Sequence, residues 1–295
     1  MSGIDVAHEI PPYAPAPAAS PLALSSSSRT AVRVVLVVLA ALVTLGTLSS
    51  LGALAFGVSS IRVVDDTQAL PASVRSLTID IRGVPVAVSV ATDLGATEPR
   101  VVLRAVTTND DTGLAVANDV AGSRVTLRDS VAGYMRWVHE AYIRVILPPG
   151  AARVLSMTVN QRTGSLSTDA NLDQLVANID YGAVTLGGSA RRVDVNVRRG
   201  DIRTRTPIAV TESFKADTES GGISVEFRVA PRTTEAIAND DVTVGLPVRG
   251  PYRVRAQSEA RHGETTVTVP ETSDPGAPEV MAHSKGAHVA VTELR

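Results

Sequence analysis

Arginine is the residue type in this sequence whose spacing points most directly to binding chemistry. Six arginines fall within 15 residues: Arg191, Arg192, Arg198, Arg199, Arg203 and Arg205. A guanidinium group binds phosphate or carboxylate through forked pairs of hydrogen bonds. On strands with alternating side chains, Arg198, Arg203 and Arg205 face outward, and we expect them to form a surface for an anionic ligand. The alternative is a solvated face that Asp194 and Asp201 partly neutralise.

The overall composition limits which ligands fit such a surface. The formal net charge of the chain is −2, and aromatic residues make up only 3% of it. Nucleic-acid binding needs a basic protein with aromatic stacking platforms beside its arginines, so we consider it disfavoured. A cell-wall polymer, an anionic lipid or a membrane protein fits better as the partner.

Catalytic and metal chemistry are not indicated by the sequence. The chain has no cysteine, which excludes thiolate metal sites, disulfides and cysteine nucleophiles. Phosphate-loop, nucleophile-elbow, zinc-protease and dinucleotide-binding motifs are also absent. Aligning Gly263 with Gly286 keeps His262, His283 and His288 apart, so they do not converge on a metal. We therefore predict a non-enzymatic protein with no catalytic residues, no cofactor and no metal.

The aromatic residues of this chain are few, but three of them cluster. Tyr134, Trp137 and Tyr142 lie within nine residues of one another. They could cap the open end of a repeat array, because terminal repeats need a cover. The alternative is a contact patch for a partner or a sugar ring.

The elements that must position these residues are indicated by a repeating glycine. Apolar stretches with alternating side chains follow Gly164, Gly182, Gly200, Gly222, Gly263 and Gly286. The first spacings are 18, 18 and 22 residues, and Asp241 takes the place of a glycine in the longer gap that follows. A period of about 20 residues is typical of a solenoid, and glycine allows the sharp turn that each coil needs.

Alternation within the repeats predicts which side chains face the core. We expect these residues to point inward: Val193, Val195, Val197, Ile202 and Thr204. We expect these to point outward: Asp194, Asn196, Arg198, Arg203 and Arg205. From Val74 onward strand patterns follow one another with no convincing helix, so the predicted fold is all-β, a parallel β-solenoid.

These features resemble those of a known family. The relevant motifs are Ile79-Asp80-Ile81-Arg82-Gly83, then Leu147-Pro148-Pro149-Gly150, then tandem coils such as Gly200-Asp201-Ile202. The chain resembles the bacterial putative-adhesin family, a domain of unknown function, over residues 74–295 and most clearly over 141–228. The resemblance implies a membrane-anchored ectodomain built as a parallel β-solenoid, and it carries over no catalytic residues.

One segment is apolar enough to cross a membrane. Residues 34–58 carry no charge and would span ~37 Å as a helix, which exceeds a hydrocarbon core of about 30 Å. Arg29 and Arg33 precede it, so the positive-inside rule places the N-terminus in the cytoplasm. The alternative is a signal peptide cleaved after Ala55. We favour the uncleaved anchor, which makes this a single-pass protein of the cell membrane with its C-terminal domain extracytoplasmic.

Four segments follow from these patterns. Residues 1–33 are rich in proline and serine and predict a disordered cytoplasmic tail. Residues 34–58 form the transmembrane helix, 59–73 a juxtamembrane linker, and 74–295 the adhesin-like domain.

Three functions agree with this organisation. The first is a non-enzymatic adhesin-like protein that binds or scaffolds at the cell envelope. The second is an accessory component of a membrane-stress or signalling system that acts through a membrane partner. The third, a surface enzyme that acts on polysaccharide, is weakest because the sequence has no clustered acidic and aromatic groove pattern.

Overall fold

The structure is a computed structural model that describes residues 36–47, 62–107, 112–119, 122–128 and 140–294. It divides into two compact units, residues 1–59 and 60–295, which we describe separately. In the first unit, residues 36–47 form an α-helix with exposed side chains. The rest of the predicted transmembrane helix (34–58) and the predicted tail (1–33) lie outside the described residues. Over the described part of the chain, none of the helices has the length and apolar content needed to cross a bilayer.

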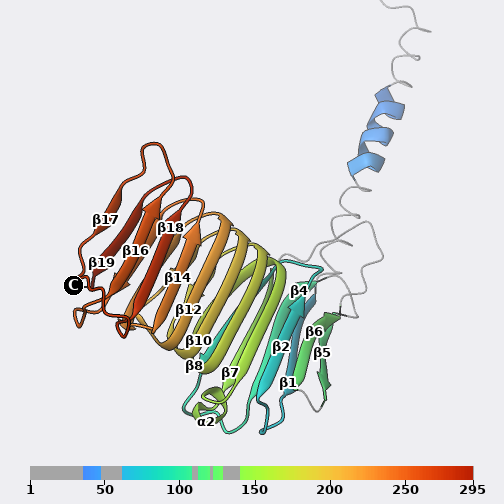
Figure 1. The fold of residues 1–295 in the computed structure, drawn as a ribbon. Coiled ribbons are helices and arrows are strands. Elements are labelled where there is room, and N and C mark those ends of the chain that lie inside the picture. The colour runs from blue at the N-terminus through green and yellow to red at the C-terminus, as the bar shows by residue number, and fades with distance from the viewer. Residues whose placement is uncertain (1–35, 48–61, 108–111, 120–121, 129–139, 295) are drawn as a thin grey trace, which may run out of the picture. The chain divides into compact units, whose positions relative to one another are not determined.

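Over its described residues the second unit consists of strands and one short helix, α2 (Pro149–Ala152), which confirms the all-β part of the predicted fold class (Figure 1). Its first strands are β1 (Arg62–Ala69), β2 (Ser76–Ile81), β3 (Val86–Thr92), β4 (Arg100–Thr107), β5 (Gly113–Asn118), β6 (Ser123–Arg128) and β7 (Glu140–Leu147). Then follow β8 (Ser156–Tyr181), β9 (Val184–Leu186), β10 (Gly188–Arg199), β11 (Ile202–Thr204), β12 (Ile208–Ser220) and β13 (Ile223–Val229). The last are β14 (Thr233–Ala238), β15 (Val242–Leu246), β16 (Arg253–Ser258), β17 (Thr265–Val267), β18 (Glu279–Ser284) and β19 (Val289–Glu293).

These strands pair in two sheets, which we call sheet A and sheet B. Sheet A runs β1-β4-β7-β3-β8-β9-β11-β13-β15-β19-β17. Sheet B runs β5-β6-β2-β8-β10-β12-β14-β18-β16. The long strand β8 contributes to both sheets, because it pairs with β2 in sheet B and then with β3 in sheet A. From β8 onward all of these pairings are parallel, and each turn of chain through both sheets forms one coil.

The side chains inside the coils are apolar and line up from one coil to the next. Val195 lies beside Ala177 of the preceding coil and Ala216 of the following one, at offsets of 18 and 21 residues. Val193, Val195, Val197 and Ile202 are buried, as predicted, whereas Thr204 is only half-buried. All five residues predicted to point outward are exposed. Apart from Thr204, the alternation therefore divides this coil correctly into a core face and a solvent face.

Glycine forms a column at the turn between the sheets. Gly164, Gly182, Gly200 and Gly221 all have positive φ, at 139°, 149°, 139° and 136°. A Cβ added to Gly182 would lie 1.5 Å from the carbonyl oxygen of Gly164, and one on Gly200 would lie 1.8 Å from that of Gly182. The turn therefore excludes any side chain on two grounds, conformation and space. The fourth glycine of the column is Gly221, not the predicted Gly222, because the turn closes one residue earlier in this longer coil.

Part of the predicted juxtamembrane linker is instead a strand. Residues 62–69 form β1, which pairs antiparallel with β4 at the edge of sheet A. Asp66 also ties this strand to β5, since its Oδ2 accepts a hydrogen bond of 2.8 Å from the backbone N–H of Leu114. The adjacent charged residues Asp65 and Asp66 interrupt the alternation of apolar and polar residues from which an edge strand is predicted.

The last coils do not stack in sequence order. Strand β18 lies between β14 and β16, and β19 lies between β15 and β17 (Figure 1). The burial of the side chains agrees with this order: Val280 and Val291 of the inserted coil are fully buried, whereas Val254 and Val267 of the outermost coil are only partly buried. Strand β16 is also rich in arginine, and charged side chains suit the edge of a sheet.

We predict that Gly182→Ala destabilises the protein by about 3 kcal/mol or more, because it combines a positive φ with a clash against backbone. The measurement is the free energy of unfolding in denaturant. Gly83→Ala is the matched control, because nothing lies within 4 Å of a Cβ at that position. Equal effects of the two substitutions would contradict the glycine column.

The coil order can be tested by disulfide trapping, because the chain has no native cysteine. Glu235 and Met281 are register partners on β14 and β18, whereas Arg255 lies one strand further along. Adjacent strands are about 4.8 Å apart, within reach of a disulfide, and strands two apart are not. We expect the Glu235→Cys/Met281→Cys variant to cross-link on mild oxidation and the Glu235→Cys/Arg255→Cys variant to stay reduced. The reverse pattern would mean that the coils stack in sequence order.

Candidate functional site

The structure separates the arginine cluster into two groups that face different directions. Arg198 lies on β10 in sheet B, whereas Arg203 lies on β11 in sheet A and Arg205 follows that strand directly. The glycine turn at Gly200 lies between them. Because the inner faces of both sheets share one core, outward side chains of the two sheets leave the coil on different sides. The three arginines predicted to form one surface therefore do not lie on neighbouring strands of one sheet.

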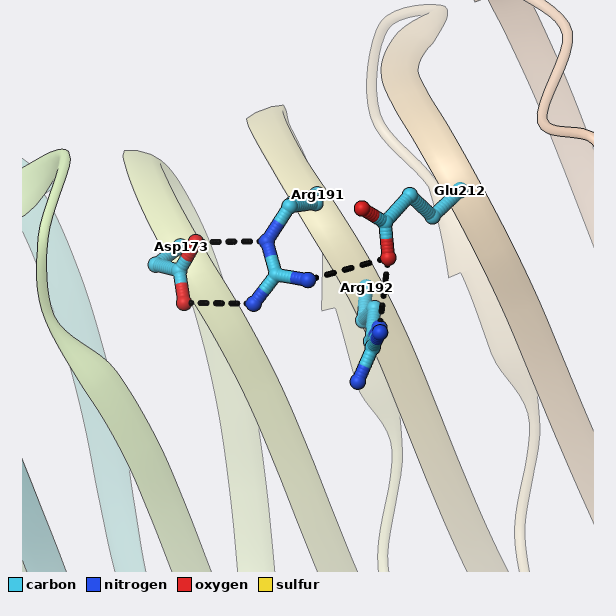
Figure 2. Close-up of polar contacts among 4 residues, drawn as sticks. All are labelled: Asp173, Arg191, Arg192 and Glu212. Atoms are coloured by element: carbon cyan, nitrogen blue, oxygen red, sulfur yellow. Dashed lines mark hydrogen bonds and ion pairs between the residues drawn. The ribbon is translucent and has the colours of Figure 1, made fainter.

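Two other arginines of the cluster are held by carboxylates (Figure 2). Arg191 donates to both carboxylate oxygens of Asp173, with Nε–Oδ1 and Nη2–Oδ2 distances of 2.8 and 3.0 Å. Its Nη1 donates to Glu212 Oε2 at 2.9 Å, and Arg192 Nε donates to the same oxygen at 2.7 Å. This four-residue network joins β8, β10 and β12.

An irregularity in β12 positions Glu212 for this network. The register of β10 against β12 shifts between Ala190 and Arg192, whose partners are Val210 and Ser213. Two residues of β12 therefore face Arg191 alone, as in a β-bulge. The extra residue turns the carboxylate of Glu212 toward both arginines.

Hydrogen bonds within the network shift the pKa values of Asp173, Glu212 and Arg191. The hydrogen bond from Arg191 lowers the pKa of the Asp173 carboxyl, and that from Arg192 lowers the pKa of the Glu212 carboxyl. The pKa of the Arg191 guanidinium is raised, chiefly by its hydrogen bond to Asp173. Both carboxylates are therefore charged at neutral pH, and they offset the charges of these two arginines within the protein.

Arg198 and Arg199 also have partners on sheet B. Arg198 Nε lies 3.7 Å from Glu219 Oε2, and both side chains are more than half exposed. The guanidinium carbon of Arg199 lies 5.5 Å from the ring centroid of Tyr181, its register partner on β8. The expected neutralising residues, Asp194 and Asp201, form no ion pair within the described residues, and Asp201 instead accepts a hydrogen bond from the Gly222 backbone N–H at 3.0 Å.

Arg203 and Arg205 differ from the rest of the cluster. Both are exposed on sheet A, and in the part of the chain that the structure describes neither forms an ion pair with a carboxylate. Arg205 Nη2 donates to Ser167 Oγ at 3.3 Å. Thr185 and Ser224 are the register partners of Arg203 on either side. Two guanidinium groups among hydroxyl side chains form the candidate anion site, with Glu226 of β13 exposed close by.

The predicted aromatic cluster is only partly visible. Tyr134 and Trp137 lie outside the described residues. Tyr142 lies on β7, an internal strand of sheet A between β3 and β4, with the Arg144 guanidinium carbon 5.5 Å from its ring centroid. Burial raises the pKa of the Tyr142 hydroxyl, but hydrogen bonds with Ser89 and Arg144 outweigh it and the net shift is downward.

The histidines make separate local contacts. His283 Nε2 lies 3.1 Å from Glu259 Oε1, and His288 Nδ1 accepts a hydrogen bond from the Glu264 backbone N–H at 3.0 Å. The register of β17 against β19 places Gly263 one residue away from the predicted partner, Gly286. Among the described residues, no group of three or more acidic or histidine side chains could hold a metal ion.

Comparison with known proteins gives structural likeness only. No family model matches the sequence, and no curated protein does. Similar solved structures include a putative cell adhesion protein from Clostridium sporogenes, at 8% identity and a TM-score of 0.37, covering 79% of this chain and 100% of that one. Others are a putative adhesin from Bacteroides fragilis (10% identity, TM-score 0.40) and a putative lipid binding protein from Parabacteroides distasonis (10%, 0.36), each covering 79% of this chain and 97% of its own.

The descriptions of these adhesins agree with the family that the sequence resembles. Every one of these TM-scores is below 0.5 and every identity is 10% or lower. Likeness at this level gives no information on the ligand of this chain.

We predict that the ion-pair network stabilises the fold in a pH-dependent way. Because the pKa values of Asp173 and Glu212 are lowered in the folded state, their contribution is complete above the ordinary values of 3.8 and 4.5 and is lost as the pH falls through the lowered ones. Arg191→Ala should lower the melting temperature at pH 7 and have a smaller effect at pH 3. The measurement is thermal unfolding across this range. An effect that does not depend on pH would contradict the electrostatic interpretation.

Proposed function

We propose that this protein is a membrane-anchored, extracytoplasmic, adhesin-like protein that binds anionic material of the cell envelope without catalysis. Residues 34–58 serve as its anchor, and the stacked coils serve as a β-solenoid that presents long polar faces. The period of about 20 residues and the parallel register support the solenoid, and the apolar run after Arg29 and Arg33 supports the anchor.

The observation that carries the proposal is that the arginines on the two sheets differ in whether they pair with carboxylates of the protein. On sheet B, Arg191, Arg192 and Arg198 contact carboxylates of neighbouring coils. On sheet A, Arg203 and Arg205 lie among hydroxyl side chains with their charge available to a ligand. A forked donor that is not paired with a carboxylate of the protein suits phosphate or carboxylate groups of a wall polymer.

The packed interior supports a role for the outer faces. Val195, Val197, Ile202 and Phe227 are fully buried, and Phe227 packs edge-to-face on Phe214 with 5.0 Å between ring centroids. Since apolar side chains fill the coils, the polar outer faces of the sheets are the surfaces available to an extended polymer.

We predict that Arg203→Ala/Arg205→Ala weakens co-sedimentation of residues 60–295 with isolated cell envelopes by about tenfold, as expected for loss of two charge-assisted contacts. Binding by the unmodified protein should also weaken as salt is raised. The matched control is Arg198→Ala/Arg199→Ala, which removes the same charge from sheet B and should bind almost normally. Equal loss in both variants would assign binding to net charge, and no binding by the unmodified protein would overturn the proposal.

A further inference from the structure

A groove of about 440 Å³ lies where three connections between strands meet. These are the connections from β13 to β14, from β15 to β16 (residues 247–252) and from β17 to β18 (residues 268–278). They come together because the last coil is inserted out of sequence order. Arg203 and Arg205 do not line the groove, so a ligand bound there is distinct from the one in the proposed function.

The walls of the groove are fixed by hydrogen bonds within the protein. The Tyr252 backbone N–H donates to Pro270 O at 2.8 Å, and the Thr272 N–H donates to Tyr252 O at 2.9 Å. The buried Tyr252 hydroxyl donates to Pro247 O at 2.5 Å. The proline-rich connections on both sides are therefore preformed, which reduces the conformational entropy that the protein loses when a ligand binds.

The lining of the groove is mostly apolar. The side chain of Val229 is 45% exposed, although valine is usually buried. The other apolar residues that line the groove are Ala230, Pro247, Pro251, Ala277 and Pro278. A concave apolar surface of this volume is typical of a small-molecule site.

Two arginines supply the charge of the groove. Arg228 and Arg249 are exposed, and neither forms an ion pair with a carboxylate in the described part of the chain. Arg228 Nη1 donates to Pro207 O at 3.1 Å, which steadies this guanidinium and leaves its other N–H groups available. Asp274 is the acidic residue that lines the groove, and its Oδ1 accepts a hydrogen bond from the Gly276 N–H at 2.9 Å. The groove therefore carries one net positive charge.

We propose that this groove binds a phosphate monoester that carries an apolar group. The phosphate is held between Arg228 and Arg249, and the apolar group packs against Val229 and Ala277. Two guanidinium groups, one at the end of β13 and one in the β15–β16 connection, suit a tetrahedral phosphate, whose oxygens point in several directions, better than a planar carboxylate.

The test uses the full-length chain in a neutral maltoside detergent, with binding followed by isothermal titration calorimetry. The probes are phenyl phosphate, inorganic phosphate and phenyl glucoside. Phenyl phosphate should bind most tightly, because it alone supplies both the charge and the apolar group. Absence of phenyl phosphate binding, or equal affinity for inorganic phosphate, overturns the proposal.

Variants separate this site from general charge effects. Arg228→Ala/Arg249→Ala should weaken phenyl phosphate binding by about tenfold or more. The matched control, Arg232→Ala/Arg261→Ala, removes two exposed arginines that do not line the groove and should leave binding unchanged. Equal affinity of both double variants for phenyl phosphate overturns the proposal.

Two further variants keep both arginines in place. Ala277→Trp should fill the apolar part and weaken phenyl phosphate binding severalfold. Asp274→Asn should strengthen binding, since it keeps the acceptor for Gly276 and removes the negative charge. No change in either variant would overturn the proposal, whatever the envelope binding of the Arg203→Ala/Arg205→Ala variant.

Discussion

The stacking of the coils depends on glycine at one turn. At Gly164, Gly182 and Gly200 the chain turns with positive φ while the carbonyl of one glycine lies where the Cβ of the next would be. This contact sets the offset between coils, at 18 residues where the turns are shortest. Once that offset is fixed, side chains one coil apart in sequence become neighbours in space, and every column inside and outside the sheets follows from it.

The same offset decides which charges meet. Asp173 lies 18 residues before Arg191 and Glu212 lies 21 residues after it, so both carboxylates reach one guanidinium from adjacent coils. Acidic residues nearer in sequence, such as Asp194 and Asp201, do not. In a stack of coils the electrostatic neighbour of a residue is therefore one period away, and charge has to be counted across coils rather than along the chain.

The regular offset between coils explains which features of the fold can be predicted from the sequence. Except at Thr204, alternation identified the predicted buried and exposed residues of β10 and β11, because the direction of side chains along a strand depends on local order. The repeat period also predicts the partners of Arg191 when it is applied to charged residues as well as to glycines, because Asp173 and Glu212 lie about one period away. Two features were not accessible in this way. The bulge that turns Glu212 toward the two arginines depends on one extra residue in β12, and the insertion of β18 and β19 depends on pairings between strands that are not consecutive in the sequence.

The out-of-order coil also links fold to function. If the coils stacked in sequence order, short turns would connect them and the sides would be uniform ladders of strands. Inserting residues 279–293 requires longer connections, over residues 247–252 and 268–278, and these leave the ladder to enclose a groove. Regular coils place exposed charge on flat faces, where it suits an extended polymer. The irregular connections place charge beside an apolar hollow, where it suits a small amphiphilic anion, so the two candidate sites differ in ligand class because they differ in the regularity of the backbone beneath them.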